Sequence, residues 1–391
     1  MRICVFSRTM HRHRPYYIPP LGNLARLFVG LGHQVTALTQ ALPDGGEGRF
    51  EDEGIEVHYL RGTGPGRPIA GFWRSSAARF DQLHSERGFD LVFGRGNATW
   101  GYFRLSRFAG QVPVISHEGT YPRWMHQIET RSQRLGAWLS PPLALALAPV
   151  QRQMRLSRRL ADRVVGNSAA LAGALARADW WHPPRTTFIP YGFETEGYEP
   201  VAATDPPRLA YLGRLARDKG LFTLIDMLAR LSRKDVTVEA IGPGSERFRA
   251  ALAARAAARG LAERFRMPGP VPHGEVGPRL AGAAVFVFAS THHEGLPKVV
   301  MGAMAAGLPV VAFALPGMDT LVVDGVTGHL VRPRDGAGFT ARVEALLADP
   351  AAAARMGAAG RRRIETEFAP AAIAARWDAL LREVAGGAGP D

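Results

Sequence analysis

Short apolar runs alternate with helical patterns along almost the whole chain, and this alternation is the strongest restriction on its fold. Such alternation is typical of α/β proteins, in which parallel strands form a sheet and helices cover its faces. The pattern is interrupted once, in a proline-containing stretch between residues 195 and 208. The 391 residues are enough for two domains with complete cores. We therefore expect two Rossmann-like halves joined by a linker.

Six strands are expected in each half of the chain. Those of the first half are Arg2–Phe6, Gln34–Leu38, Glu56–Leu60, Asp90–Phe93, Val112–Ile115 and Arg163–Gly166. Those of the second half are Leu209–Leu212, Val236–Ile241, Phe265–Met267, Val285–Phe288, Val310–Ala314 and Gly328–Val331. The expected boundaries are 1–190 for the first domain, 191–208 for the linker, 209–368 for the second domain, and 369–391 for a C-terminal helix that returns to the first domain and ends in a frayed tail.

One segment of the second half combines a strand, a glycine turn and the start of a helix. The apolar run Val285–Phe288 is followed by Glu294 and Gly295, and then by a helix of small residues that ends at Gly307. The free backbone N–H groups at a helix start bind anions, phosphate above all. A carboxylate in front of such a helix suits the hydroxyl groups of a sugar. The segment therefore predicts a sugar-phosphate site.

A second glycine turn carries two cations. The strand Leu209–Leu212 leads into Gly213, and Arg214 and Lys219 follow five residues apart. This pair could hold a diphosphate through charge-assisted hydrogen bonds, or it could be an ordinary helix start with surface cations. Only three lysines occur among the 48 basic residues. Two of them, Lys219 and Lys298, lie in glycine-bounded turns, which suggests a need for a compact ammonium group.

These two segments resemble the motifs of retaining glycosyltransferases of family 4. Residues 294–309, EGLPKVVMGAMAAGLP, resemble the E-x7-E signature of that family, and Gly213 to Gly220 are similar to its G-R-x4-K-G turn. The resemblance implies the GT-B fold, in which two Rossmann-like domains face a central cleft. It also implies transfer of a sugar from a nucleoside diphosphate sugar, with no metal and no cofactor besides that co-substrate. Retention would follow from front-face attack.

The resemblance also implies roles for individual residues. It makes His117 and Glu294 the catalytic residues. It places Arg214, Lys219, Leu296, Pro297 and Lys298 on the donor diphosphate. It places Gly22, Gly213, Gly242, Val271 and Gly295 near the nucleotide or its sugar. Glu118 and Arg12 would lie on the acceptor side.

Several of these residues also have a purely structural interpretation. His117 follows an apolar strand and could be a core or helix-capping histidine. Gly242 could belong to a simple turn, and the cationic loop around Arg12 could be a solvated loop without a ligand. Glu118 could orient His117 instead of binding the acceptor.

The chain departs from the family pattern at Gly302, where the second glutamate of E-x7-E is expected to hold the ribose hydroxyls. Weaker or altered nucleotide recognition is therefore expected, and Gly302→Glu should tighten nucleoside diphosphate binding. The alternative is a catalytically silent GT-B subunit that binds a glycan or another transferase. A dinucleotide-dependent oxidoreductase is disfavoured because no G-x-G-x-x-G follows the first strand.

The net charge of +13 favours anionic ligands or surfaces, although no nucleic-acid-binding motif accompanies it. Arg152, Arg155, Arg158 and Arg159 are spaced as one helix face, either solvated or in contact with an anionic membrane. The single cysteine and the lack of a signal-peptide pattern or a spanning segment predict a cytoplasmic protein, or one peripheral to the inner face of the membrane. The expected acceptor is a cell-envelope glycan, a lipid or a small molecule.

Overall fold

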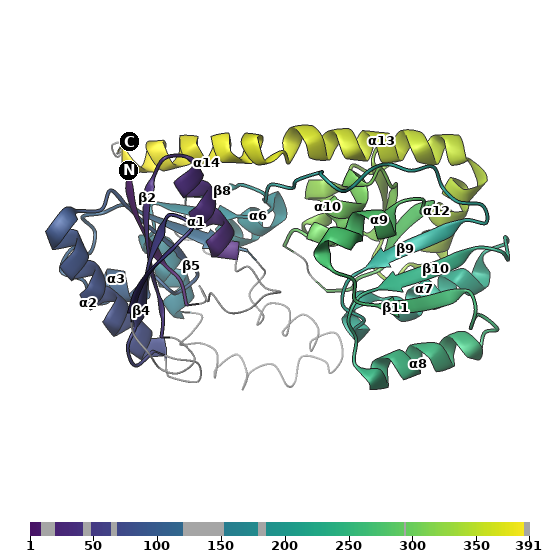
Figure 1. Ribbon diagram of the computed structural model, residues 1–391, viewed down its shortest axis with the longest axis horizontal. Coiled ribbons are helices and arrows are strands. Elements are labelled where there is room, and N and C mark those ends of the chain that lie inside the picture. The colour runs from purple at the N-terminus through teal and green to yellow at the C-terminus, as the bar shows by residue number, and fades with distance from the viewer. Residues whose placement is uncertain are drawn as a thin grey trace. The chain divides into compact units, whose positions relative to one another are not determined.

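The computed structural model describes residues 1–8, 20–41, 48–63, 69–119, 152–178, 185–292 and 295–386. The chain divides into two compact units, one formed by Met1–Ile189 with Ala374–Asp391 and the other by Pro190–Ile373. Each unit is built on one largely parallel sheet with helices on its faces (Figure 1). The expected fold class, two Rossmann-like α/β domains, is confirmed. Arg12 and Glu294 lie outside the described residues.

The first unit has an eight-stranded sheet in the order β3-β4-β2-β1-β5-β6-β7-β8. Its strands are β1 (Arg2–Phe6), β2 (Gln34–Gln40), β3 (Gly48–Asp52), β4 (Ile55–Leu60), β5 (Leu91–Arg95), β6 (Val114–Glu118), β7 (Arg163–Gly166) and β8 (Thr186–Phe188). Only β3 pairs antiparallel, with β4. The helices are α1 (Pro20–Gly30), α2 (Ile69–Arg87), α3 (Trp100–Leu105), α6 (Ala169–Ala178) and most of α14 (Pro370–Ala385).

Both faces of this sheet are covered, which explains why its central strands are apolar on both sides. On one face, residues of α2, α3 and α6 form a core with Phe6, Val92 and Val114 of the sheet. On the other face, Phe28 of α1 and Trp377 of α14 both pack edge-on against Phe93 of β5, with ring centroids 5.1 and 5.7 Å away. The C-terminal helix therefore belongs to the core of the first unit.

The second unit has a six-stranded, all-parallel sheet in the order β11-β10-β9-β12-β13-β14. Its strands are β9 (Arg208–Leu212), β10 (Thr237–Ile241), β11 (Phe265–Gly269), β12 (Val285–Phe288), β13 (Val310–Phe313) and β14 (Gly328–Val331). Its helices are η2 (Arg217–Lys219), α7 (Leu221–Arg230), α8 (Glu246–Ala257), η3 (His273–Glu275), α9 (Val276–Leu280), α10 (Lys298–Ala305), α11 (Met318–Leu321), α12 (Gly336–Ala348) and α13 (Pro350–Glu367).

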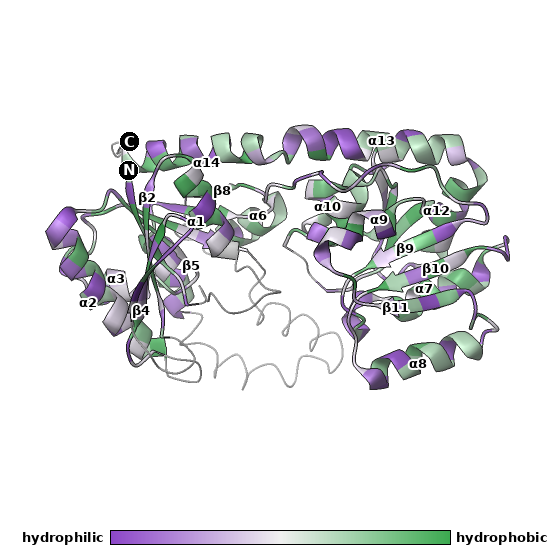
Figure 2. Ribbon diagram, in the orientation of Figure 1, coloured by the Kyte–Doolittle hydropathy of each residue, from purple (hydrophilic) through white to green (hydrophobic). Residues whose placement is uncertain are grey.

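Side-chain capping and amphipathic patterning account for several of these helices. Ser245 accepts a hydrogen bond from the Phe248 N–H at the start of α8, and Asp349 accepts one from the Ala352 N–H at the start of α13. Pro350 occupies the first position of α13, where a missing N–H costs nothing. Figure 2 shows polar and apolar residues mixed along α2, α8 and α13, as expected for helices with one face on the protein.

All twelve expected strands are present, eight of them with shifted ends, and the described residues contain two further strands. The strand expected at Val112–Ile115 runs over Val114–Glu118, so His117 and Glu118 lie inside the strand and not after it. The additional strands β3 and β8 pair at the two edges of the first sheet. Both are short and lack a buried apolar run, so their pairing depends on the neighbouring strand. Within the described ranges, no helix is both long and apolar enough to cross a membrane.

Candidate functional site

Three loops meet at the carboxyl ends of adjacent strands in the second unit. The N–H of Gly213, after β9, donates to the Ile241 carbonyl of β10 at 3.0 Å. A Cβ on Gly242 would lie 2.1 Å from the Gly213 carbonyl oxygen, so only glycine allows the two turns to approach this closely. Leu215 continues the contact through a 2.7 Å hydrogen bond from its N–H to Pro243 O. The turns after β9 and β10 therefore pack directly against each other through their backbones.

The turn that carries both cations is also held against β12. Gly220 has a φ of 73°, and a Cβ there would lie 1.8 Å from the Ala289 carbonyl oxygen just after β12. The N–H of Thr291 donates to the Asp218 carbonyl at 2.9 Å. Within this turn Lys219 is 8% exposed, whereas Arg214 is exposed. The fold thus places a buried ammonium and an accessible guanidinium in one short turn at the ligand-binding edge of the sheet.

The helix α10 begins at the same edge, in the loop that follows β12. Its first turn has Pro297 as N-cap residue with no side-chain hydrogen bond, and Leu296 before it is buried. The ammonium of Lys298 lies 5.4 Å from the centre of the Tyr191 ring, and burial lowers its pKa from the usual value. Gly295 is described, while Glu294 next to it is not. This helix start provides backbone donors and an exposed cation next to the Tyr191 ring.

The end of β11 completes this edge of the sheet. The Gly242 N–H donates to the Gly269 carbonyl at 2.9 Å, which joins the end of β10 to that of β11. Val271 follows two residues later and packs partly buried against the core of the unit. Gly213, Gly242 and the loop that contains Val271 thus lie along one edge, as the sequence predicts.

The position of the missing glutamate is filled by aromatic rings. Gly302 is buried in α10, and a Cβ there would lie 3.1 Å from Cε1 of Tyr198 and 3.5 Å from Cζ of Phe193. The two rings pack edge-on with centroids 5.2 Å apart. The space next to Gly302 is therefore occupied by apolar groups.

In the first unit, His117 lies deep in the protein. It is fully buried between Phe93 and Trp377, with ring centroids 6.3 and 6.0 Å away. Burial, reinforced by the charge of Arg95, lowers the pKa of His117 to about 3. The imidazole is therefore neutral at physiological pH. Gly22 is buried in the first turn of α1.

We expect His117 to make the first unit less stable in acid. Its pKa of about 3 lies below the ordinary 6.5, so between these values the unfolded chain binds a proton that the folded chain does not. The free energy of unfolding should therefore fall as the pH falls through this window, by up to about 1.4 kcal/mol per pH unit from this group. The described tryptophans Trp73, Trp100 and Trp377 lie in this unit and the sequence has none between residues 190 and 373, so urea unfolding followed by fluorescence at pH 7 and pH 5 measures the effect. His117→Gln should reduce this difference, while His273→Gln in an exposed loop should not. The same pH dependence in wild type and His117→Gln would contradict the assignment.

Glu118 belongs to a group of buried polar side chains that sequence reasoning found only in part. Glu118 is 5% exposed, and burial raises its pKa although Arg158 and Arg95 oppose the shift. Asn167, 1% exposed, donates from Nδ2 to Gly119 O at 2.7 Å. Among the described residues, neither Glu118 Oε1 nor Asn167 Oδ1 has a hydrogen-bond partner. Buried acceptors of this kind are rare and require an explanation.

Strand register brings these side chains together. Glu118 of β6 is paired with Gly166 of β7, directly before Asn167. Ligands bind beyond the carboxyl ends of parallel strands, and Asn167 directly follows the predicted strand Arg163–Gly166. The sequence could therefore have identified Asn167 as a candidate. A third buried side chain without a hydrogen-bond partner among the described residues, Thr99, follows no predicted strand end, so the sequence does not point to it. It is fully buried over Gly94, where a Cβ would lie 2.3 Å from its Cγ2.

The expected basic helix face is smaller than its spacing indicates. Residues 152–160 are helical, and Arg152, Arg155 and Arg159 are exposed. Arg158 is only 2% exposed and its charge lowers the pKa of Glu118, so it belongs to the interior. The prediction of four surface arginines was wrong because helical spacing alone does not distinguish a surface face from a neighbouring half-buried one.

Two family models match the chain in series. Residues 20–192 match the glycosyl transferase 4-like domain, and residues 194–363 match the glycosyl transferases group 1 domain. Glycogen synthase of Mycobacterium tuberculosis is 31% identical over 245 residues, which are 61% of this chain and 58% of that protein. D-inositol 3-phosphate glycosyltransferase of Geodermatophilus obscurus is 30% identical over 264 residues, 61% of this chain and 57% of that protein. The matches thus span less than two thirds of these relatives' own length.

Solved structures share the fold over nearly the whole chain. Sucrose-phosphate synthase of Thermosynechococcus elongatus superposes with a TM-score of 0.77 at 21% identity, covering 98% of both chains. HepE of Anabaena in complex with UDP gives 0.72 at 18% identity, covering 97% of this chain and 99% of that one. Such similarity establishes the architecture. The chain therefore combines a glycosyl transferase 4-like domain with a glycosyl transferase group 1 domain on the GT-B fold.

Proposed function

We propose that this chain is a family 4 retaining glycosyltransferase that moves a sugar from a nucleoside diphosphate sugar to an acceptor without a metal ion or other cofactor. The observation that carries the proposal is the junction of the Arg214–Lys219 turn with the ends of β10 and β12, within the region matched by the group 1 family model. HepE, which shares the fold, was solved with UDP and with UDP-glucose, which supports a nucleotide sugar as donor.

In this proposal the donor diphosphate is held by two kinds of group. Arg214 and Lys219 neutralise its charge, which does the work that a metal ion does in other transferases. At the start of α10, Leu296 and Lys298 add backbone N–H donors and the helix adds the positive end of its dipole, while Pro297, which has no N–H, fixes the turn between them. The glycines at 213, 242 and 295 and the loop at Val271 let the nucleotide approach the backbone.

The proposed reaction keeps the anomeric configuration. The bond between the anomeric carbon and the β-phosphate oxygen breaks, and the acceptor oxygen bonds to that carbon from the same face. The acceptor proton passes to the departing diphosphate. Glu294 is the proposed sugar-contacting residue. His117, predicted as a second catalytic residue, is fully buried and neutral, so the proposal gives it the core role and not contact with the sugar.

The acceptor side is proposed to include Glu118 and Asn167. The two oxygens that lack a partner among the described residues would accept hydrogen bonds from hydroxyl or amino groups of a bound molecule, which would offset the cost of burying them. Arg12 stays a proposal for the same side, and Gly22 stays a proposal for contact with the nucleotide or its sugar. A glycan, a lipid-linked sugar or a small polyol would all supply such donors, and a cell-envelope glycan is the proposed class.

A peripheral position on the inner face of the cell membrane is proposed on a separate observation. The exposed Arg152, Arg155 and Arg159 accompany Leu160, which is 50% exposed, on the helix formed by residues 152–160. Basic side chains next to an exposed apolar one are typical of contact with anionic lipid.

Gly302 favours a second candidate, a silent GT-B subunit that binds a glycan or a partner transferase. The rings of Tyr198 and Phe193 leave no room there for a ribose-binding carboxylate. Such a subunit would bind nucleotides poorly, while its binding role would survive Glu294→Ala.

Calorimetric titration with UDP, GDP, ADP, dTDP and CDP separates the two candidates. We expect wild type to bind one of these nucleotides and Lys219→Ala to lose that binding, because the lysine meets the diphosphate. Transfer from the matching nucleotide sugar, followed by NMR of the product, then reports whether the anomeric configuration is retained. No binding to any of the five would favour the silent subunit.

A further inference from the structure

A cavity lies in the first unit, at the edge of the sheet opposite to its carboxyl ends. Its volume is about 680 Å³, which is within the range of small-molecule sites. It opens between the first residues of β1, β2 and β4, the edge strand β3 and the end of α2. The chemistry-bearing residues of its lining include Arg2, Arg49, Arg87, Glu51, Glu56 and Phe50.

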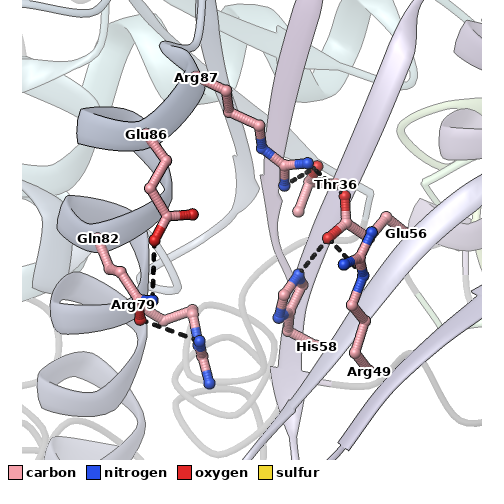
Figure 3. Close-up of polar contacts among 8 residues, drawn as sticks. All are labelled: Thr36, Arg49, Glu56, His58, Arg79, Gln82, Glu86 and Arg87. Atoms are coloured by element: carbon pink, nitrogen blue, oxygen red, sulfur yellow. Dashed lines mark hydrogen bonds and ion pairs between the residues drawn. The ribbon is translucent and has the colours of Figure 1, made fainter.

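The Glu56 carboxylate organises this cavity but is already fully engaged. Figure 3 shows Arg87 reaching from the end of α2 toward Glu56 and Thr36, with contacts of 2.6 Å to Glu56 Oε2 and 3.0 Å to Thr36 Oγ1. The other carboxylate oxygen, Oε1, lies 2.7 Å from His58 Nε2 and 2.9 Å from Arg49 Nε. Glu56 thus has a donor on each oxygen, and Arg87, His58 and Arg49 share its negative charge.

Titration keeps the cavity positive at neutral pH. Burial raises the pKa of Glu56, but hydrogen bonds from Arg87 and His58 outweigh burial, so the pKa is lowered and the carboxylate stays charged. Burial lowers the pKa of His58, with Arg79 and Arg87 adding to the effect against the pull of Glu56, so its ring is neutral. The lining contains three arginines (Arg2, Arg49 and Arg87) and two glutamates (Glu51 and Glu56), so its charged side chains carry a net charge of +1.

The arginines are distributed along the cavity instead of being clustered at one point. Arg2 is on β1, Arg49 is on β3, and Arg87 bridges the two strands between them, since β1, β2, β4 and β3 are consecutive in the sheet. Three strand spacings correspond to about 14 Å. Arg2 donates to the Arg87 carbonyl, and the side chain of Arg49 is 71% exposed. Both can therefore meet a ligand as long as a substituted hexose.

One aromatic ring at the border of the cavity, Phe50, is exposed to a ligand, while a second, Phe89, lies in its wall. Phe89 is buried in its wall beneath the Arg87 guanidinium, which lies 5.5 Å from the ring centre. Phe50 at its border is 38% exposed and packs edge-on against Tyr59. Planar polar side chains next to aromatic rings match the hydroxyls and the apolar face of a pyranose.

We propose that this cavity binds a small anionic sugar, carrying a phosphate or a carboxylate, at a site separate from the donor and acceptor edges. The charged group meets Arg49 or Arg2, and the ring lies near Phe50 and Phe89. His117, Glu118 and Asn167 lie at the carboxyl ends of the same sheet, so a ligand in this cavity occupies neither proposed substrate site. Binding here does not depend on the proposed transferase activity.

Calorimetry with four probes tests the site: glucose 6-phosphate, glucuronate, glucose and inorganic phosphate. We expect one or both anionic sugars to bind at least about tenfold more tightly than glucose, since only they form charge-assisted hydrogen bonds with the arginines. The stronger of the two identifies the charged group. Arg49→Ala should weaken binding about fivefold or more, and Glu56→Gln should strengthen it because one negative charge is removed.

Two control variants locate the binding. Arg74→Ala removes an exposed arginine elsewhere on α2 and should leave affinity unchanged. Lys219→Ala should also leave it unchanged, which separates this cavity from the donor site. Glucose that binds as tightly as the anionic sugars would overturn the proposal. Inorganic phosphate that binds as tightly as glucose 6-phosphate would also overturn it, because the cavity would then hold an adventitious ion only. Absence of binding, or an unchanged affinity in Arg49→Ala, would also overturn it. Because Arg49 is on the surface, its variant should fold even if Glu56→Gln is destabilised.

Discussion

Replacing Lys219 with alanine should lower kcat/KM for sugar transfer by about 100-fold or more, which corresponds to about 2.7 kcal/mol of transition-state stabilisation. The charge on the diphosphate grows as the glycosidic bond breaks, so a fixed ammonium stabilises the transition state more than the ground state. Lys219 is 8% exposed in a turn that is fixed by backbone contacts to β12. A cation held in a dry, rigid turn acts on this charge without having to reorganise.

The burial of Lys219 calls for a variant that separates charge from packing. Lys219→Met keeps most of the aliphatic stem, so it should lose activity as Lys219→Ala does while melting closer to wild type. Arg217→Ala removes an exposed cation from the same turn and should change kcat/KM by less than about threefold. Steady-state kinetics with the donor found by calorimetry, together with melting curves, gives all three values. A loss of activity in Lys219→Ala that is matched by unfolding, or an active Lys219→Met, would refute the diphosphate role.

The fold could be predicted from the sequence because its central strands are buried on both faces. A strand such as Val285–Phe288 is entirely apolar, and no other local structure explains such a run between two helical patterns. The edge strand β3, Gly48–Asp52, has the opposite character, with charged and exposed residues. Its pairing with β4 is set by tertiary context, which periodicity does not contain. β8 was not predicted for the same reason, since Thr186–Phe188 contains no buried apolar run.

The turns at the strand ends could be predicted from the sequence, because they depend on backbone geometry, whereas the burial of individual side chains could not. Glycines at strand ends indicate turns where backbones approach closely. In the structure a Cβ on Gly242 would lie 2.1 Å from the Gly213 carbonyl oxygen, and a Cβ on Gly220 would lie 1.8 Å from that of Ala289. By contrast, the sequence contains nothing that separates the interior Arg158 from the exposed Arg159. The cavity around Glu56 was also missed, because it is assembled from residues far apart in the chain.

Gly302→Glu should destabilise the second unit by about 3 kcal/mol or more and should not tighten nucleotide binding. The sequence alone predicts the opposite, on the assumption that the space next to Gly302 is empty. The Tyr198 and Phe193 rings fill that space, with a Cβ only 3.1 Å from Tyr198 Cε1. A glutamate would have to displace the rings or bury a carboxylate without a partner, and either change is costly. Calorimetric unfolding and nucleotide titration measure the two quantities.

Two companion variants show whether the rings are the cause. Gly302→Ala adds only the Cβ, so a small shift of the Tyr198 ring is offset by the better helix propensity of alanine, and stability should stay within about 1 kcal/mol of wild type. Tyr198→Ala combined with Gly302→Glu opens space for the carboxylate, so it should bind nucleotide more tightly than Tyr198→Ala alone if the ribose lies there. If Gly302→Glu alone is as stable as wild type and binds nucleotide more tightly, the rings are not the obstacle. In that case the ribose pocket is intact, and the chain lacks only the second glutamate of the E-x7-E signature, at the position of Gly302.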